Sequence, residues 1–215
     1  MVATSKQSTS RLEDARARMY RDLIFESAEC VFGARGFEGA TMQEIANEAG
    51  VSLKTVYASY PGKRELFDAI MRERGAAFHD HVREAVENTH GGTLEQLEAM
   101  TGAFVEFLFA HREWLQIHMR SRIAWSVRPS EEAAADLWRR GLEDFEKLLG
   151  EGIEQGLFYP TDPSELAVLV NTITKVLVTY AAEAGEDDPH PVAERATLYL
   201  RRLLCVPGAA ERASG

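Results

Sequence analysis

The chain has 215 residues, of which 45% are apolar and 27% charged, so it is long enough for one large or two small globular domains. Its net charge is −10, yet residues 1–75 carry 11 Lys and Arg against 11 Asp and Glu, so the whole acidic excess lies in residues 76–215. The two cysteines, Cys30 and Cys205, are too few for a disulfide framework and are typical of a reducing compartment.

Neither the first ten residues nor the most apolar stretch has the pattern expected of a secretory signal or a membrane span. The first ten residues are polar and lack the apolar run of a secretory signal. Residues 166–182 are the most apolar, but they include Asn171, Thr174 and Lys175, so we expect them to be too short and too polar to span a bilayer. We therefore expect a cytoplasmic protein with no membrane partner.

Apolar residues recur at helical spacing along the chain, and no segment alternates with the period of a β-strand. A stripe from Tyr20 to Phe32 predicts a first helix that Gly36 ends. Caps and breakers divide the rest. The nine predicted helices span residues 16–35, 41–49, 52–59, 63–89, 93–110, 111–125, 130–155, 164–183 and 190–205. The predicted fold class is all-α.

Residues 41–60 carry the most informative pattern. Thr41 and Glu44 have the spacing of a capping box, and Ser52 can cap a second short helix directly after Gly50, which can adopt the positive φ of a tight turn. Two capped short helices joined in this way predict a helix-turn-helix, whose second helix fits a DNA major groove. A plain αα-hairpin with the same apolar seam is the alternative reading.

Once the second helix is seated on its apolar residues, its other side chains are candidates for contact with DNA. Lys54 could read a guanine or lie against a phosphate, and Lys63 lies beside the N-terminus of the next helix, where free amides suit a phosphate. Basic residues Lys6, Arg11, Arg16 and Arg18 form either an arm for a minor groove or a solvated tail. The candidate DNA-binding residues are Thr41, Gln43, Leu53, Lys54, Thr55, Tyr57, Ser59 and Lys63.

The chain resembles the tetracycline-repressor (TetR) family over about residues 16–66. The resemblance is carried by Phe37, Thr41, Glu44-Ile45-Ala46, Ala49-Gly50-Val51-Ser52, Thr55-Val56-Tyr57, Tyr60 and Lys63-Arg64-Glu65-Leu66. Lys54 stands where the family commonly has Gly or Pro, and Ala58-Ser59 replaces a pair that is often aromatic or His, so the operator sequence cannot be inherited. The resemblance implies a homodimeric repressor that a small-molecule inducer releases from a double-stranded DNA operator.

On this interpretation residues 1–15 are a disordered arm, 16–62 the DNA-binding domain, 63–206 a ligand-binding and dimerisation domain that starts with a connecting helix at 63–89, and 207–215 a disordered tail. Helices 164–183 and 190–205 are expected to form the dimer interface. The first of them is apolar on nearly all sides, which would also suit a central core helix.

An inducer pocket is expected among the helices of the second domain, where aromatic side chains suit a flat or apolar ligand and a few polar groups can orient it. Aromatic residues at helical spacing equally suit a plain core. The candidate ligand-binding residues are Phe104, Trp114, His118, Arg122, Trp138, Phe145, Asn171 and Thr174.

No cofactor, metal site or catalytic residue is predicted. The six histidines do not cluster with other ligands in sequence, and no nucleophile, phosphate-loop or dinucleotide fingerprint occurs. The leading hypothesis is a ligand-responsive transcriptional repressor rather than an enzyme. The alternatives are an all-helical small-molecule-binding protein or enzyme with a structural N-terminal hairpin, and a DNA binder without an inducer.

Overall fold

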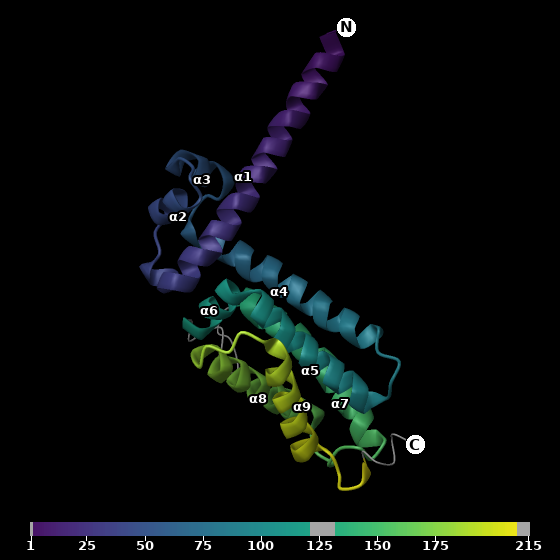
Figure 1. Cartoon of the computed structure of the whole chain (residues 1–215). Helices are drawn as coiled ribbons and strands as arrows, with labels where there is room; N and C mark the ends of the chain where they lie inside the picture. Colours follow the sequence, from purple (N-terminus) through teal and green to yellow (C-terminus); the bar gives the residue numbers. More distant parts are fainter. Residues whose placement is uncertain (1, 121–131, 210–215) are drawn as a thin grey trace.

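The structure is a computed structural model that describes the backbone of residues 2–120 and 132–209, and the side chains of residues 11, 13–120, 139 and 141–209. Within these residues the chain is all-helical, as the sequence predicts, apart from an isolated bridge between Phe158 and Cys205 (Figure 1). The nine described helices are α1 (Val2–Gly39), α2 (Met42–Glu48), α3 (Leu53–Ser59), α4 (Lys63–Glu87), α5 (Thr93–Ala110), α6 (Arg112–Arg120), α7 (Glu132–Glu154), α8 (Pro163–Glu183) and α9 (Pro189–Leu204).

The first three helices form a small domain around the second half of α1. Each of the three helices contributes a fully buried side chain to the hydrophobic core: Phe32 from α1, Ile45 from α2 and Val56 from α3. The regular course of α1 is interrupted at Gly36, whose φ of 70° only glycine adopts at little cost. This kink directs the chain back along α1 into α2.

The N-terminal part of α1 differs from the sequence prediction. The structure continues the helix back to Val2, where the sequence predicts a disordered arm over residues 1–15, and Figure 1 shows this part projecting away from the molecule. No Gly or Pro interrupts residues 2–32, so nothing in the local sequence ends the helix. The basic side chains of Arg11, Arg16 and Arg18 are exposed along it.

The larger domain is built around α5, which packs against α4, α7 and α9 (Figure 1). Leu97, Phe104 and Leu108 of α5 lie in its core. The Phe158 ring, in the turn after α7, packs directly against the backbone of α7 at Gly152. A Cβ at Gly152 would lie 2.1 Å from this buried ring. Only glycine therefore fits at position 152.

The two domains meet along α1, where α6 and α4 contact it. At the crossing of α1 and α6, a Cβ on Gly33 would lie 3.0 Å from the carbonyl oxygen of Glu113, and the Arg120 Nε donates to the Gly33 carbonyl at 2.7 Å. From α4, Arg74 donates two hydrogen bonds to the buried carboxylate of Glu29. The DNA-binding domain is thus fixed to both the first and the third helix of the larger domain.

Candidate nucleic-acid interface

The α2–α3 unit has the local geometry that its sequence predicts. Thr41 and Ser52 both take extended backbone at the N-caps and accept hydrogen bonds from the amides of Glu44 and Thr55, at 3.2 and 3.1 Å. Gly50 takes a φ of 63° between the helices. These caps and this turn hold α3 across α2 as the second helix of a helix-turn-helix.

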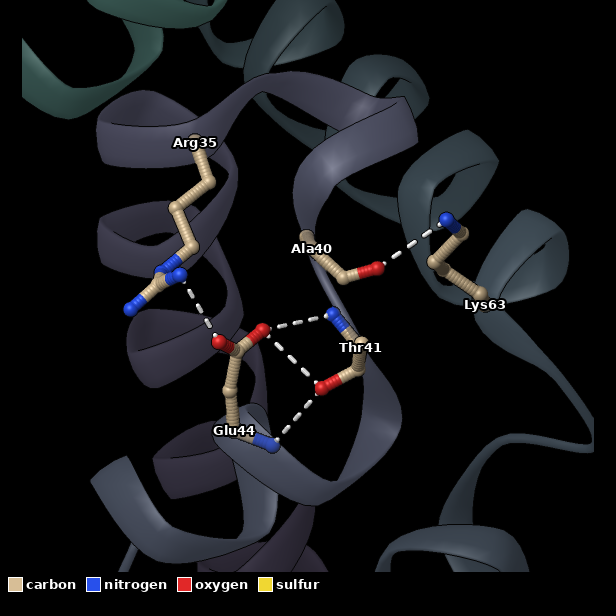
Figure 2. Close-up of polar contacts among 5 residues, drawn as sticks. All are labelled: Arg35, Ala40, Thr41, Glu44 and Lys63. Atoms are coloured by element: carbon tan, nitrogen blue, oxygen red, sulfur yellow. Dashed lines mark hydrogen bonds and ion pairs between the residues drawn. The ribbon is translucent and has the colours of Figure 1, made fainter.

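The capping box of α2 also connects this helix to α1. Figure 2 shows the Glu44 carboxylate accepting hydrogen bonds from the amide and hydroxyl of Thr41, at 3.0 and 2.9 Å, and pairing with Arg35 of α1 at 2.9 Å. Thr41 is exposed, but its hydroxyl is already used within the protein. Its role in the structure is to position α2.

The outward face of α3 consists of Lys54, Tyr57 and the helix start. Lys54 is exposed, and Tyr57 is 50% exposed even though large aromatic residues are usually buried. α3 packs on α1 and α2 within the same domain, and Figure 1 shows it apart from α5 to α9 of the larger domain. Lys54 and Tyr57 are the candidates that the structure leaves best placed for DNA.

The other candidates on these two helices are less available. Thr55 is half-buried and its hydroxyl lies 2.7 Å from the Ser52 hydroxyl, so it supports the cap of α3. Leu53 and Ser59 are half-buried, and Leu53 packs against the domain core. Gln43 is exposed but its amide donates to Asn47 at 2.9 Å.

Lys63 has a structural role that the sequence prediction does not include. Its ammonium donates to the carbonyl oxygens of Phe37 at 2.7 Å and Ala40 at 3.0 Å, and lies 4.5 Å from the centre of the Phe37 ring (Figure 2 shows the bond to Ala40). These carbonyls follow the kink at Gly36 and have no helical partner of their own to satisfy them. The ammonium expected at a phosphate is therefore bound inside the protein, where it fixes α4 to the α1–α2 turn.

The eight candidate ligand-binding residues do not form one group in the described structure. Three of them lie in one aromatic cluster. The ring centre of Phe78 lies 5.0 Å from that of Phe104 and 5.9 Å from that of Trp114. The His118 ring centre lies 4.4 Å from that of Trp114. Phe145 is buried on α7, outside the ring contacts of this cluster. The side chains of Arg122 and Trp138 lie outside the described residues.

The two polar candidates on α8 differ in their surroundings. Thr174 is buried, and its hydroxyl donates to the Val170 carbonyl at 2.9 Å, so it needs no ligand or second copy of the chain to satisfy it. Asn171 is half-buried one turn earlier. Among the described residues, no group of three or more His, Cys, Asp or Glu side chains could hold a metal ion.

The residues that sequence reasoning missed lie at the junction between the domains. Glu29 and Arg74 are 45 positions apart, and Gly33 and Arg120 are 87 apart, so no local spacing relates them. The sequence does hold one indication of these contacts. Glu29 is a charged residue between Ala28 and Val31, on the buried side of the helix. A buried charge requires a partner.

A capped helix-turn-helix that presents a cation and an aromatic side chain, carried on a larger all-helical domain, defines a DNA-binding transcriptional regulator. A family model described as "Bacterial regulatory proteins, tetR family" matches residues 24–70. Residues 24–70 are thus the DNA-binding domain of the TetR family of transcriptional regulators.

The chain is also similar to regulators of known sequence and, in its fold, to solved structures. The chain is 29% identical to the uncharacterised regulator YfiR of Bacillus subtilis, over 84% of this chain and 90% of that one. It is 25% identical to the transcriptional repressor KstR2 of Mycobacterium tuberculosis, over 65% and 70% of the two chains. The structure of AibR in complex with isovaleryl coenzyme A and operator DNA superposes with a TM-score of 0.70, at 21% identity and over 83% and 96% of the chains.

Proposed function

We propose that this regulator is a cytoplasmic repressor that binds a palindromic operator as a homodimer and leaves it when a small, largely apolar or aromatic inducer binds. The observation that carries the proposal is the outward face of α3, where Lys54 and Tyr57 are exposed on a helix held by two caps. A short rigid helix with a cation and an aromatic hydroxyl can contact both phosphates and base edges. KstR2, a relative over most of its length, is itself named a repressor.

The proposed dimer interface is the outer face of α8 and α9. Val176 and Tyr180 of α8 are 60% and 68% exposed, and Leu203 of α9 is 55% exposed. By length and composition α8 could also cross a membrane, which differs from the sequence expectation, but a helix that packs against protein on all sides has the same composition. A second copy of the chain would cover these side chains and place two α3 helices about 34 Å apart, one turn of DNA.

The proposed inducer site includes the aromatic cluster of α4, α5 and α6, to which Phe104, Trp114 and His118 belong. An apolar pocket wall with few polar groups suits a hydrophobic inducer body. The AibR structure contains isovaleryl coenzyme A, and KstR2 is described as a ketosteroid regulator, so structurally similar proteins are associated with ligands that have apolar parts.

Two contacts are available to carry a change from this site to α3. One route runs from α5 to the connecting helix α4, because α5 packs along α4. The junction adds a second route, because α6 carries Trp114 and also touches α1 at Gly33. The inducer must bind the two arrangements with different affinity, since only that difference can shift their populations.

The test uses the full-length chain and a fluorescently labelled duplex from upstream of its own coding sequence. Binding measured by anisotropy between 50 and 300 mM salt is expected to weaken steeply, with protection of two half-sites about one DNA turn apart. A chain that ignores duplex DNA at low salt overturns the proposal. Specific binding that no apolar compound relieves leaves a DNA binder without an inducer and overturns the inducer part.

A further inference from the structure

Trp114 Nε1 on α6 and His81 Nε2 on α4 lie inside the aromatic cluster and lack a hydrogen-bond partner in the part of the chain that the structure describes. Trp114 is only 5% exposed, so its indole N–H has little access to bulk water. A buried donor without an acceptor costs about 1–3 kcal/mol, and such groups in native proteins normally meet a protein atom, an ordered water or a ligand.

Both nitrogens belong to one continuous group of rings. The centre of the Phe107 ring lies 5.8 Å from that of Trp114 and 5.6 Å from that of His81, and Phe78 lies 5.4 Å from Phe107 and 5.9 Å from Trp114. Three helices therefore contribute to the group: α4 gives Phe78 and His81, α5 gives Phe107, and α6 gives Trp114. The two unpaired nitrogens are set among faces that favour an apolar, ring-containing occupant.

The cluster is buried on one side and open on another. Phe107 and Trp114 are buried, whereas Phe78, His81 and His111 are half-buried, so solvent reaches one edge of the group. Burial lowers the pKa of His111, whose ring centre lies 4.2 Å from that of Phe107, so the neutral form of its imidazole is favoured. A neutral ring there favours an uncharged ligand over a carboxylate.

The tryptophan limits the chemistry of the ligand further. Indole N–H is a donor only, whereas a neutral imidazole nitrogen can donate or accept. We propose that Trp114 Nε1 donates a hydrogen bond to a carbonyl oxygen of an uncharged aromatic or alicyclic inducer, with His81 Nε2 as its second polar contact. This inference rests on the proposed inducible function and specifies the site and the class of ligand.

The position of Trp114 on α6 also connects such a ligand to DNA binding. Trp114 and His118 lie on one face of α6, and Glu113 and Arg120 on the adjacent face contact Gly33 of α1. A ligand that draws the indole toward itself turns or shifts a helix of nine residues as a unit. That movement reaches α1, which carries the helix-turn-helix.

The experiment compares two probes that differ only in the acceptor, 4-phenyl-2-butanone and n-butylbenzene, by titration of 15N-labelled full-length protein. The ketone is expected to move the indole N–H resonance of Trp114 downfield and to bind about tenfold more tightly than the hydrocarbon, as one hydrogen bond to a buried donor allows. Trp114→Phe keeps an aromatic ring and identifies the resonance. It should reduce ketone affinity about tenfold and leave hydrocarbon affinity unchanged.

Other outcomes overturn the inference. The inference is excluded if the two probes bind with equal affinity, if neither probe moves the indole resonance, or if neither binds up to its solubility limit. These results would also be expected if a resident water already accepts the hydrogen bond of the indole. His81→Phe should lower ketone affinity threefold to tenfold, and provides the test if Trp114→Phe does not fold. DNA binding of the same samples separates the two proposals. If the protein binds DNA but not the probes as expected, only the ligand inference is wrong. If the protein does not bind DNA, the proposed function is wrong.

Discussion

Arg74 of α4 donates from Nε and Nη2 to the two carboxylate oxygens of Glu29 in α1, at 2.8 and 2.6 Å. The bidentate geometry is the strongest form of ion pair, and it lies where the two domains meet, with the Glu29 side chain buried. The hydrogen bonds to Glu29 raise the pKa of Arg74. The pair therefore fixes the angle between α1 and α4, on which the position of α3 depends.

Glu29→Gln is expected to lower the free energy of unfolding by about 3 kcal/mol, because it leaves a partly buried guanidinium without its counter-charge. Urea unfolding followed by circular dichroism measures the loss. Replacing both residues, Glu29→Met with Arg74→Met, is the control and should cost less than the single change, since no unpaired charge remains. A single variant as stable as the parent chain would show that the pair contributes nothing.

Lys63→Met removes a cation from the carbonyls of Phe37 and Ala40, and is expected to destabilise the DNA-binding domain by about 2 kcal/mol. If the ammonium remains within the protein when DNA binds, the slope of log affinity against log salt should not change. Lys54→Ala is the matched control, because Lys54 is exposed. It should leave stability unchanged and flatten the slope by about 0.9 for each phosphate contact. If Lys63→Met instead flattens the salt slope and leaves stability unchanged, Lys63 contacts a phosphate.

These two cases show what the sequence could and could not predict. The caps at Thr41 and Ser52 and the turn at Gly50 depend on residues within three or four positions of one another, so their spacing predicts them. The partners of Lys63 and Glu29 lie 26 and 45 positions away, and only the packed fold brings them together. The prediction of the ligand-binding candidates rests on aromatic and polar residues on predicted helices. The sequence could not relate Trp114 to Phe78, or Phe107 to His81, because these contacts depend on how α4 and α6 pack against α5.

Gly33→Ala tests the contact between α1 and α6. The added Cβ would lie 3.0 Å from the Glu113 carbonyl oxygen, so α6 must move by a few tenths of an ångström or the packing is lost. We expect a loss of about 1–2 kcal/mol in the free energy of unfolding and a weaker effect of any inducer on DNA affinity. Gly102→Ala, where a Cβ meets no atom within 4 Å inside α5, is the control: it should raise the free energy of unfolding by about 0.5–1 kcal/mol through helix propensity and leave the inducer effect unchanged. Unaltered coupling in the Gly33 variant would exclude the α6–α1 route.

Lys175 on α8 predicts a pH dependence of stability. Burial lowers its pKa from 10.5 to about 8, so between pH 8 and 10.5 the unfolded chain holds a proton that the native chain has released. The unfolded state then binds more protons, and the free energy of unfolding rises with pH across this window. Lys175→Met should abolish that rise and add about 3 kcal/mol at pH 7. Lys147 is an exposed lysine on α7, so Lys147→Met is the control. Its free energy of unfolding should still rise with pH across this window.

Val176→Glu places a charge at the centre of the exposed apolar face of α8, where Val176 is 60% and Tyr180 68% exposed. In a monomer the change is tolerated, because the side chain faces water. In a dimer through this face it buries two like charges against apolar surface, so sedimentation should report a monomer where the parent chain is a dimer. Operator affinity should then fall at least a hundredfold, because each half-site is bound separately. Thr161→Glu, an exposed position before α8, controls for added charge, and a Val176→Glu chain that remains dimeric would exclude this interface.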